Sequence, residues 1–211
     1  GATNAITGIA TAFMDSIPMV VISGQVQSHL IGTDAFQETD MIGVSRPIVK
    51  HSFTVDKQEN IAQIVKEAFH IATSGRQGPV VIDVPKDLTN PDELFDFNYP
   101  EKANIRSYNP PVKPENHQVS RAVDAILTAE RPVIYAGGGT ISSNASDELR
   151  ELNELLDFPV TNTLMGLGVY PGTGKRFLGM LGMHGTYQAN MAMHNADLII
   201  AVGARFDDRI T

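Results

Sequence analysis

Short apolar segments alternate with amphipathic ones along most of the chain. Buried strands are predicted at five runs rich in β-branched residues, 19–23, 80–84, 132–136, 159–162 and 197–202. Apolar residues spaced along one face predict a helix that begins near Thr3 or Asn4, and three more over 59–74, 116–129 and 146–156. Strands and helices in alternation indicate an α/β fold, with parallel sheets flanked by helices.

A proline-rich segment at 90–114 interrupts this alternation. Its prolines stand at 91, 100, 110, 111 and 114 without a helical period, which is typical of an extended linker. We therefore expect a first domain over 1–95, a linker over 96–114 and a second domain over 115–211. The first helix has nothing before it to pack against, and the last strand has no helix after it to cover its face. We expect a segment of a longer polypeptide.

Charge and composition narrow the function classes. With 24 Asp and Glu against 16 Lys and Arg, the net charge is -8, so we expect neither nucleic acid nor an anionic membrane as the main partner. A chain without Cys has no disulfide and no thiolate metal site, and the five His residues other than His184 show no metal-ligand spacing. An intracellular protein is favoured, and no apolar run reaches the roughly 20 residues that cross a bilayer.

Three predicted strand ends in the second domain are marked by glycine. Gly137–Gly139, Gly166 and Gly203 each follow a strand, and Arg205 and Arg209 come directly after the last one. Ligands of open parallel sheets bind outside the carboxyl ends of the strands, where glycines let backbone N–H groups approach a phosphate. Arginines there can grip a pyrophosphate with two hydrogen bonds. These features predict an elongated, anionic dinucleotide ligand.

The predicted dinucleotide site differs from a conventional NAD site. Such a site has an acidic residue at the end of the second strand, where this chain has Thr161-Asn162-Thr163. The segment 178–194 is rich in Gly and Met and is interpreted as a loop lying against a flat ring. Within it we assign Met183 and His184 to the ligand, and Met191 and Met193 to the core.

The first domain offers weaker signals. Spacing alone favours a helix cap at Thr33 or Asp34 in the polar segment 32–38. Arg76 follows a predicted helix, where a cation complements the helix dipole. Lys86 follows the strand 80–84, where it could meet a substrate carboxylate or be an ordinary surface lysine.

Taken together, the chain resembles the catalytic large subunits of acetohydroxyacid synthase, also called acetolactate synthase. The resemblance rests on segments that run along nearly the whole chain in the family's order: 1–4, 15–18, 23–26, 32–38, 50–53, 75–87, 165–168, 181–186 and 194–209. It implies part of a pyrimidine-binding domain followed by part of a Rossmann-like, FAD-binding middle domain. It also implies thiamine diphosphate, Mg²⁺ and FAD as cofactors. The family decarboxylates pyruvate and adds the thiamine-bound hydroxyethyl unit to pyruvate or 2-ketobutyrate, in branched-chain amino-acid biosynthesis.

The resemblance also assigns site residues. Phe36 and Gln37 match a catalytic pair that enters a neighbouring subunit's active site. The substrate channel is implied at Val26, Ala35, Lys86, Met183 and Asp208. Flavin contacts are implied at Arg76, Gly137, Gly138, Gly139, Thr163, Leu164, Met165, Leu181, Gly182, His184, Gly203, Arg205, Asp207 and Arg209. No metal ligand is expected in this segment.

Two family motifs do not occur in this chain. The resemblance places the catalytic Glu upstream of Gly1 and the Gly-Asp-Gly…Asn motif for Mg²⁺ downstream of Thr211, so we expect the segment alone to be inactive. The resemblance implies a homodimer or homotetramer of this chain and a regulatory small subunit as partners. It implies a bacterial cytoplasm or a plastid as the location. Two alternatives stay open. One is a related thiamine enzyme, of the glyoxylate carboligase or oxalyl-CoA decarboxylase type, and the other is a non-catalytic flavin- or nucleotide-binding module.

Overall fold

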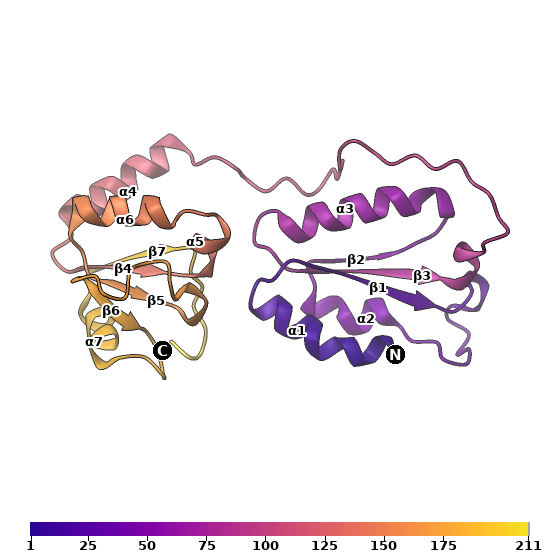
Figure 1. Ribbon diagram of the computed structural model, residues 1–211, viewed down its shortest axis with the longest axis horizontal. Coiled ribbons are helices and arrows are strands. Elements are labelled where there is room, and N and C mark those ends of the chain that lie inside the picture. The colour runs from indigo at the N-terminus through magenta and orange to yellow at the C-terminus, as the bar shows by residue number, and fades with distance from the viewer. Residues whose placement is uncertain (211) are drawn as a thin grey trace. The chain divides into compact units, whose positions relative to one another are not determined.

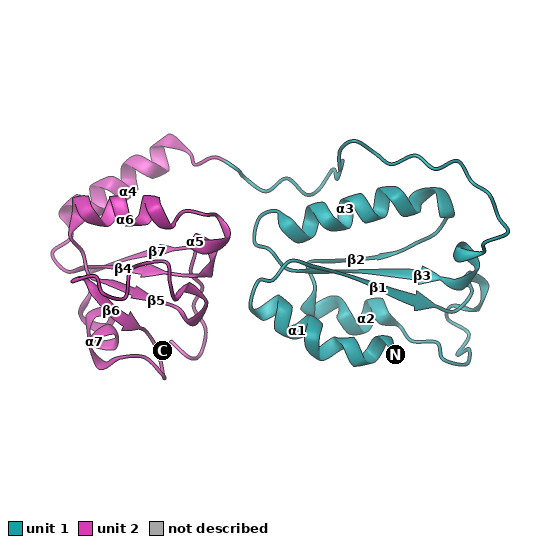
Figure 2. Ribbon diagram, in the orientation of Figure 1, with its two compact units in different colours: residues 1–112 teal, residues 113–211 magenta. Residues whose placement is uncertain are grey.

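The chain folds into two compact units in the computed structural model, which describes residues 1–210. Unit 1 spans residues 1–112 and unit 2 spans residues 113–211 (Figure 2). Each unit has its own parallel sheet with helices on both faces (Figure 1). The predicted α/β class with flanked parallel sheets is confirmed.

Unit 1 is a three-stranded sheet in the order β1 (Met19–Gln25), β3 (Pro79–Pro85) and β2 (His51–Thr54). One face packs on α3 (Ile61–Thr73), and the other packs on α1 (Ile6–Met14) and α2 (Met41–Ser45). The alternating residues of β3 separate the two cores, because Val80 and Ile82 join the α3 cluster while Val81 joins the other. The central strand is therefore buried on both faces, as its continuous apolar run predicts.

The proline-rich segment does not leave unit 1 directly after β3. Its residues Ile105 and Tyr108 pack against the core cluster beneath α3. The Lys50 ammonium donates hydrogen bonds to the Ile71 carbonyl, to the Ser74 carbonyl (2.7 Å) and to the Tyr108 hydroxyl (2.8 Å). The last part of the segment expected to be a linker is thus fastened to the C-terminal end of α3, and unit 1 continues to Val112.

Unit 2 is a four-stranded parallel sheet in the order β6 (Phe177–Met180), β5 (Val160–Asn162), β4 (Pro132–Ala136) and β7 (Leu198–Val202). Figure 1 shows α4 (Asn116–Thr128) and α6 (Ser146–Leu156) on one side of the sheet and α7 (Tyr187–Asn195) on the other. The chain visits β4, β5 and β6 in one direction and then returns to the other side of β4 with β7. This reversal makes the β4–β7 boundary a topological switch point, where ligands of such sheets bind.

The hydrophobic pattern does not predict several of the helices and strands. The structure adds β2, β6, α2, α7 and the five-residue helix α5 (Gly138–Ser142). The loop interpretation of 178–194 holds for 181–186 and is wrong for the rest, which β6 and α7 occupy. Met191 is 37% exposed and so is not core in the described part of the chain. Neither Thr3 nor Asn4 caps a helix, since α1 follows a 3-10 turn over Ala2–Ala5 without a side-chain cap.

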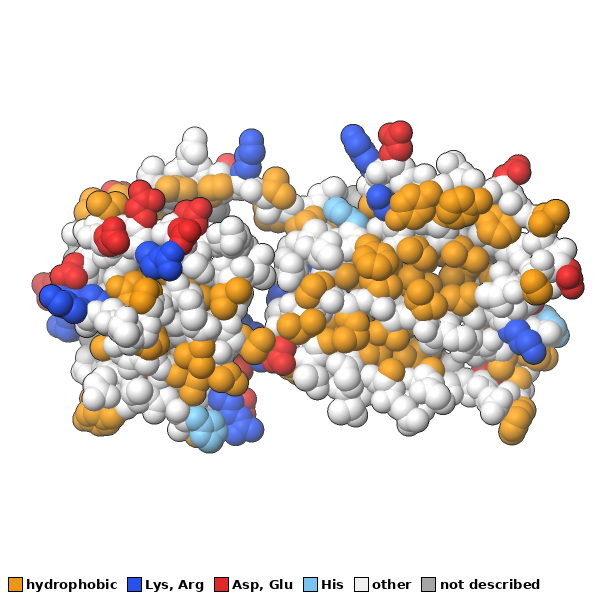
Figure 3. Space-filling model, viewed as in Figure 1, with side chains coloured by type: hydrophobic (Ala, Val, Ile, Leu, Met, Phe, Trp, Pro, Cys, Tyr) orange, Lys and Arg blue, Asp and Glu red, His pale blue; other side chains and the backbone are white. Residues whose placement is uncertain are grey.

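Both units carry exposed apolar side chains, and on unit 1 they form a contiguous group. Figure 3 shows them gathered on the face that it presents in this view, and Ile22 of the edge strand β1 is 64% exposed. Within the described residues, no helix combines the length and the apolar character that crossing a bilayer requires.

Candidate functional site

A cavity of about 760 Å³ opens in unit 1 at the carboxyl ends of β1 and β3. Four of the predicted residues line it together: Val26, Phe36, Gln37 and Lys86. Ala35, the fifth predicted residue of this region, is not among the lining residues and lies half-buried beside Phe36. The structure therefore gathers most of the substrate-channel prediction for the first domain around one cavity.

The loop that carries Phe36 and Gln37 is held by the Glu38 carboxylate. Glu38 accepts hydrogen bonds from the backbone N–H groups of Gly32 and Ala35 (2.9 Å for Ala35). These two bonds, Gly32 first, lower the pKa of Glu38 because they stabilise its ionised form. The helix cap expected at Thr33 or Asp34 is wrong, since no helix begins there.

The backbone of this loop turns sharply. Asp34 and Gln37 have φ angles of +59° and +65°, in the left-handed region that side-chain-bearing residues seldom adopt. Phe36, between them, is 89% exposed. An exposed aromatic side chain at the tip of a strained loop is a feature of binding sites, where surrounding contacts impose the conformation.

Lys86 begins a 3-10 turn, Lys86–Thr89, directly after β3, and its side chain is exposed at the cavity. Its neighbour Asp87 accepts hydrogen bonds from the Ser28 backbone N–H (2.8 Å) and the Ser28 hydroxyl (3.1 Å). The backbone bond from Ser28 is the main cause that lowers the pKa of Asp87. Asp87 thereby ties the loop after β1 to the strand end that presents Lys86.

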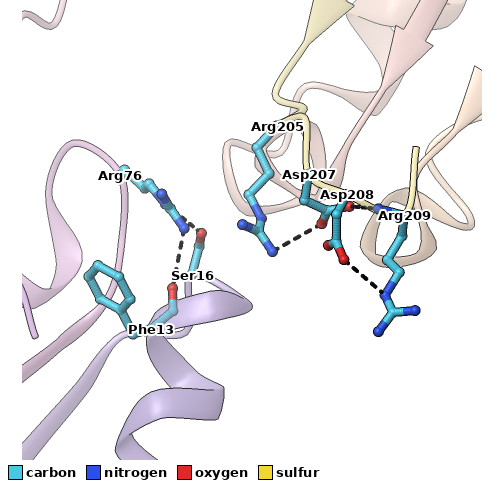
Figure 4. A network of polar contacts seen from close by, with 7 residues as sticks. All are labelled: Phe13, Ser16, Arg76, Arg205, Asp207, Asp208 and Arg209. Atoms are coloured by element: carbon cyan, nitrogen blue, oxygen red, sulfur yellow. Dashed lines mark hydrogen bonds and ion pairs between the residues drawn. The ribbon is translucent and has the colours of Figure 1, made fainter. Parts of the chain in front are cut away.

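Arg76 is bound to the end of α1 within unit 1. Its guanidinium donates to the Ser16 hydroxyl (2.9 Å) and the Phe13 carbonyl (3.2 Å), and lies 5.6 Å from the centre of the Phe13 ring (Figure 4). The arginine remains exposed.

In unit 2, glycines allow the ends of β4 and β7 to touch. The Gly137 N–H donates to the Val202 carbonyl (2.9 Å), and the Gly139 N–H donates to the Gly203 carbonyl (2.9 Å). A Cβ on Gly137 would lie 2.3 Å from the Gly203 oxygen, which is closer than any side chain can be accommodated. The predicted residues Gly137, Gly139 and Gly203 therefore meet at the topological switch point.

The segment after β5 lies at the same carboxyl-terminal end of the sheet. A Cβ on Gly138 would lie 3.0 Å from the Cβ of Met165, and the Thr163 hydroxyl accepts from the Gly166 N–H (2.9 Å). Leu164 is 69% exposed beside them. Asn162 is fully buried, and its side-chain oxygen has no hydrogen-bond partner within the described residues.

The segment after β6 completes this end of the sheet. The Leu181 N–H donates to the Asn162 carbonyl (3.1 Å), and the Met183 N–H donates to the Arg209 carbonyl (2.7 Å). Gly182 has a φ angle of +103°, and a Cβ there would lie 2.5 Å from the Arg209 oxygen. His184 follows as an exposed side chain.

Charged residues follow β7 at the carboxyl-terminal end of the sheet. The Arg205 Nη2 lies 3.2 Å from the Asp207 Oδ2, and the Arg209 Nε lies 3.7 Å from the Asp208 Oδ2 (Figure 4). Burial raises the pKa of the Tyr135 hydroxyl to about 12, and the negative charge of Asp207 adds to that rise. The Tyr135 hydroxyl is buried without a partner in the described structure.

The carboxyl ends of the unit 2 strands present groups that could contact a flavin dinucleotide. The backbones of β4 and β7 touch at Gly137, Gly139 and Gly203. The exposed Leu164 and Met183 can lie against a ring, and Arg205 and Arg209 carry guanidinium groups that pair with Asp207 and Asp208. The helix that follows β4 has only five residues, so the helix dipole contributes little. Within the described residues, no group of three His, Asp or Glu is arranged to hold a metal ion.

Comparison with known proteins gives the family. The model of the thiamine pyrophosphate enzyme N-terminal TPP binding domain matches residues 1–44, and that of the central domain matches residues 119–211. Over all 211 residues the chain is 63% identical to the acetolactate synthase large subunit of Buchnera aphidicola (subsp. Acyrthosiphon pisum) and 58% identical to the acetolactate synthase isozyme 3 large subunit of Escherichia coli. The chain belongs to the thiamine pyrophosphate enzymes. Over its whole length it is similar to acetolactate synthase large subunits.

The matches also show how much of the family's length is present. The chain spans 37% of the length of both acetolactate synthase relatives. A solved thiamin diphosphate-dependent enzyme from Mycobacterium smegmatis has the same fold, with a TM-score of 0.78 at 23% identity, over 97% of this chain and 39% of that one.

Proposed function

We propose that the full-length protein decarboxylates pyruvate and joins the remaining two-carbon unit to pyruvate or 2-ketobutyrate. The products are 2-acetolactate or 2-aceto-2-hydroxybutyrate, together with carbon dioxide. The observation that carries the proposal is 57–63% identity, over all 211 residues, to three bacterial proteins named acetolactate synthase large subunits. Thiamine diphosphate, held with Mg²⁺ mainly by other parts of the protein, would act as the electron sink for the decarboxylation.

The cavity of unit 1 is the proposed entry to the active site. The Lys86 ammonium would meet the carboxylate of an arriving 2-ketoacid, and the Gln37 amide would hydrogen-bond to the substrate. Phe36 would exclude water as part of a neighbouring subunit's site. Its 89% exposure supports this role, because a phenyl ring so far from its own core gains most when another surface covers it. Val26 and Ala35 would line the channel.

FAD is the proposed ligand of unit 2. The glycine-marked strand ends at Gly137–Gly139 and Gly203 would lie beside the diphosphate, and the guanidinium groups of Arg205 and Arg209 would bind it. The ring would lie against the segments 163–165 and 181–184, with Met183 and Asp208 toward the substrate channel. Arg76, which donates hydrogen bonds to Ser16 and Phe13, would be a further flavin contact. The position of these glycines at the topological switch point, where ligands of such sheets bind, supports this placement.

The proposal extends to partners and location. The name "large subunit" of the relatives supports a regulatory small subunit, and the exposed apolar side chains of unit 1 support burial of that face in a homodimer or homotetramer. A bacterial cytoplasm is the proposed location.

Product analysis tests the proposed function. The full-length protein, supplied with thiamine diphosphate, Mg²⁺ and FAD, should form 2-acetolactate from pyruvate alone and 2-aceto-2-hydroxybutyrate when 2-ketobutyrate is added. Lys86→Met should raise the KM for the ketoacid by about tenfold, because one charge-assisted hydrogen bond is lost. Lys57→Met, at another exposed lysine of unit 1, should leave the KM unchanged. Turnover of glyoxylate or oxalyl-CoA without turnover of pyruvate would identify a different thiamine enzyme.

A further inference from the structure

The loop between β1 and α2 is closed at its base by a single side chain. Gln25, the last residue of β1, accepts a hydrogen bond from the Val26 N–H (2.8 Å) and donates one to the Thr39 carbonyl (2.8 Å). Val26 begins the loop and Thr39 ends it. One amide group therefore joins both ends of the segment that carries Phe36 and Gln37.

The Gln25 amide has a second hydrogen to donate, and it goes to a buried carboxylate. Its nitrogen lies 2.9 Å from one oxygen of Asp83, and the Ser23 hydroxyl donates to the other oxygen at 2.7 Å. Asp83 is only 2% exposed. Within the described residues, no Lys or Arg lies within ion-pair distance of it.

These contacts allow only one orientation of the amide. Turned over, the Gln25 oxygen would face both the Asp83 carboxylate and the Thr39 carbonyl, so three acceptors would meet without a donor. A buried carboxylate without a cation depends on its hydrogen-bond donors, and bonds to an ionised acceptor are the stronger ones. Asp83 therefore orients the amide that closes the loop.

We infer that Gln25 and Asp83 form a clasp that positions the Phe36–Gln37 tip for the reaction. Two side-chain-bearing residues of the loop have left-handed φ angles, Asp34 (+59°) and Gln37 (+65°), so the loop is strained and needs a rigid base. Phe36 itself is 89% exposed and has little of its own unit to rest on. The inference rests on the proposed function for the role of the tip, while the clasp itself rests on these contacts alone.

The test is a pair of changes in the full-length enzyme with its cofactors bound. Gln25→Glu places a carboxylate against that of Asp83 and leaves the Thr39 carbonyl without its donor. Adding Asp83→Asn to it supplies an amide that can donate to the introduced carboxylate, and so restores one side of the clasp. Gln118→Glu makes the same chemical change on the exposed surface of α4 and serves as the control.

Two readouts are needed, hydrogen exchange of the 26–39 amides and steady-state kinetics on pyruvate. We expect Gln25→Glu to speed exchange in 26–39 and to lower kcat about 10- to 100-fold with flavin content unchanged, and the double variant to recover a large part of both. Unchanged exchange in 26–39, or a loss that spreads over unit 1 and is not rescued, would overturn the clasp. Altered and rescued exchange in a protein that makes no acetolactate would instead keep the clasp and overturn the proposed function.

Discussion

The two candidate sites are built in opposite ways. In unit 1 the cavity loop is held by side chains, with Glu38, Asp87 and the Gln25–Asp83 pair each bonding to backbone or amide groups. In unit 2 the strand ends meet through the backbone, because glycines leave room for direct contact. A site held by side chains responds to charge and pH, whereas a site made of backbone responds to volume. The two units should therefore fail under different substitutions.

The largest effect is expected from volume in unit 2. Gly137→Ala places a Cβ 2.3 Å from the Gly203 oxygen and 2.5 Å from the Ala204 Cα, so β4 and β7 must separate. We expect a loss of about 3 kcal/mol of stability, the upper end of ordinary overpacking. Gly172→Ala is the matched control, because its Cβ would meet only a Phe177 ring atom at 3.9 Å. Urea unfolding of both variants measures the difference, and equal midpoints would contradict the close contact.

A smaller effect is expected from the tyrosine that fastens the proline-rich segment. The Tyr108 hydroxyl donates to the Ser74 carbonyl (2.8 Å) and accepts from the Lys50 ammonium (2.8 Å). Tyr108→Phe removes both bonds and should cost about 1–2 kcal/mol. Tyr99→Phe should cost almost nothing, because the Tyr99 ring contact with Lys66 at 5.0 Å does not use the hydroxyl. Proteolysis between residues 100 and 112 should accelerate only in the Tyr108 variant. Equal cleavage in both would show that the segment is not fastened there.

Acid should loosen the loop of unit 1 before it affects unit 2's strand ends. The hydrogen bonds from the Gly32 and Ala35 N–H groups lower the pKa of Glu38. The stabilisation of the loop by the ionised Glu38 is therefore complete above the ordinary Glu pKa and is lost as the pH falls through the lowered pKa. The amide NMR signals of Gly32 and Ala35 should shift together in that acid range. Glu38→Gln should abolish the step. A shift that persists in this variant would assign the effect to another carboxylate.

The smallest effect is expected at the amino-terminal ends of the unit 2 strands. Arg176 and Asp157 form an ion pair there, and both side chains are largely exposed. Screening by water leaves such pairs with little net value, so Arg176→Ala should change the unfolding midpoint less than either Gly137→Ala or Tyr108→Phe. A change as large as that of Tyr108→Phe would mean that these strand ends are also a structural anchor.

The sequence predicts the parts of the fold that repeat. Long apolar periods locate α3, α4 and α6, and β-branched runs locate β1, β3, β4, β5 and β7. The strands β2 and β6 are missed because neither contains a run of β-branched residues, and β6 contains Gly179 within a Gly- and Met-rich segment. Their pairing comes from tertiary contacts with β3 and β5, which no local pattern records.

The two sites differ in the same respect. Glycines after strands predict the unit 2 edge, because a missing side chain is visible in the sequence. The clasp of Gln25 and Asp83 is not predictable in this way, since 58 residues separate its two members and β1 and β3 bring them together. Glu38 has a local signal, as it bonds to residues three and six positions earlier, yet spacing favoured Thr33 and Asp34 instead.

The most direct measurement is flavin retention by the full-length protein after Arg205→Ala. Purified protein is loaded with FAD, passed through gel filtration, and its released flavin is quantified against Arg176→Ala, an arginine at the opposite edge of the same sheet. We expect the Arg205→Ala protein to lose most of its flavin and the Arg176→Ala protein to retain it, because Arg205 follows β7 at the switch point and Arg176 does not. Equal retention in the two variants would contradict a flavin site at the glycine-built edge of unit 2.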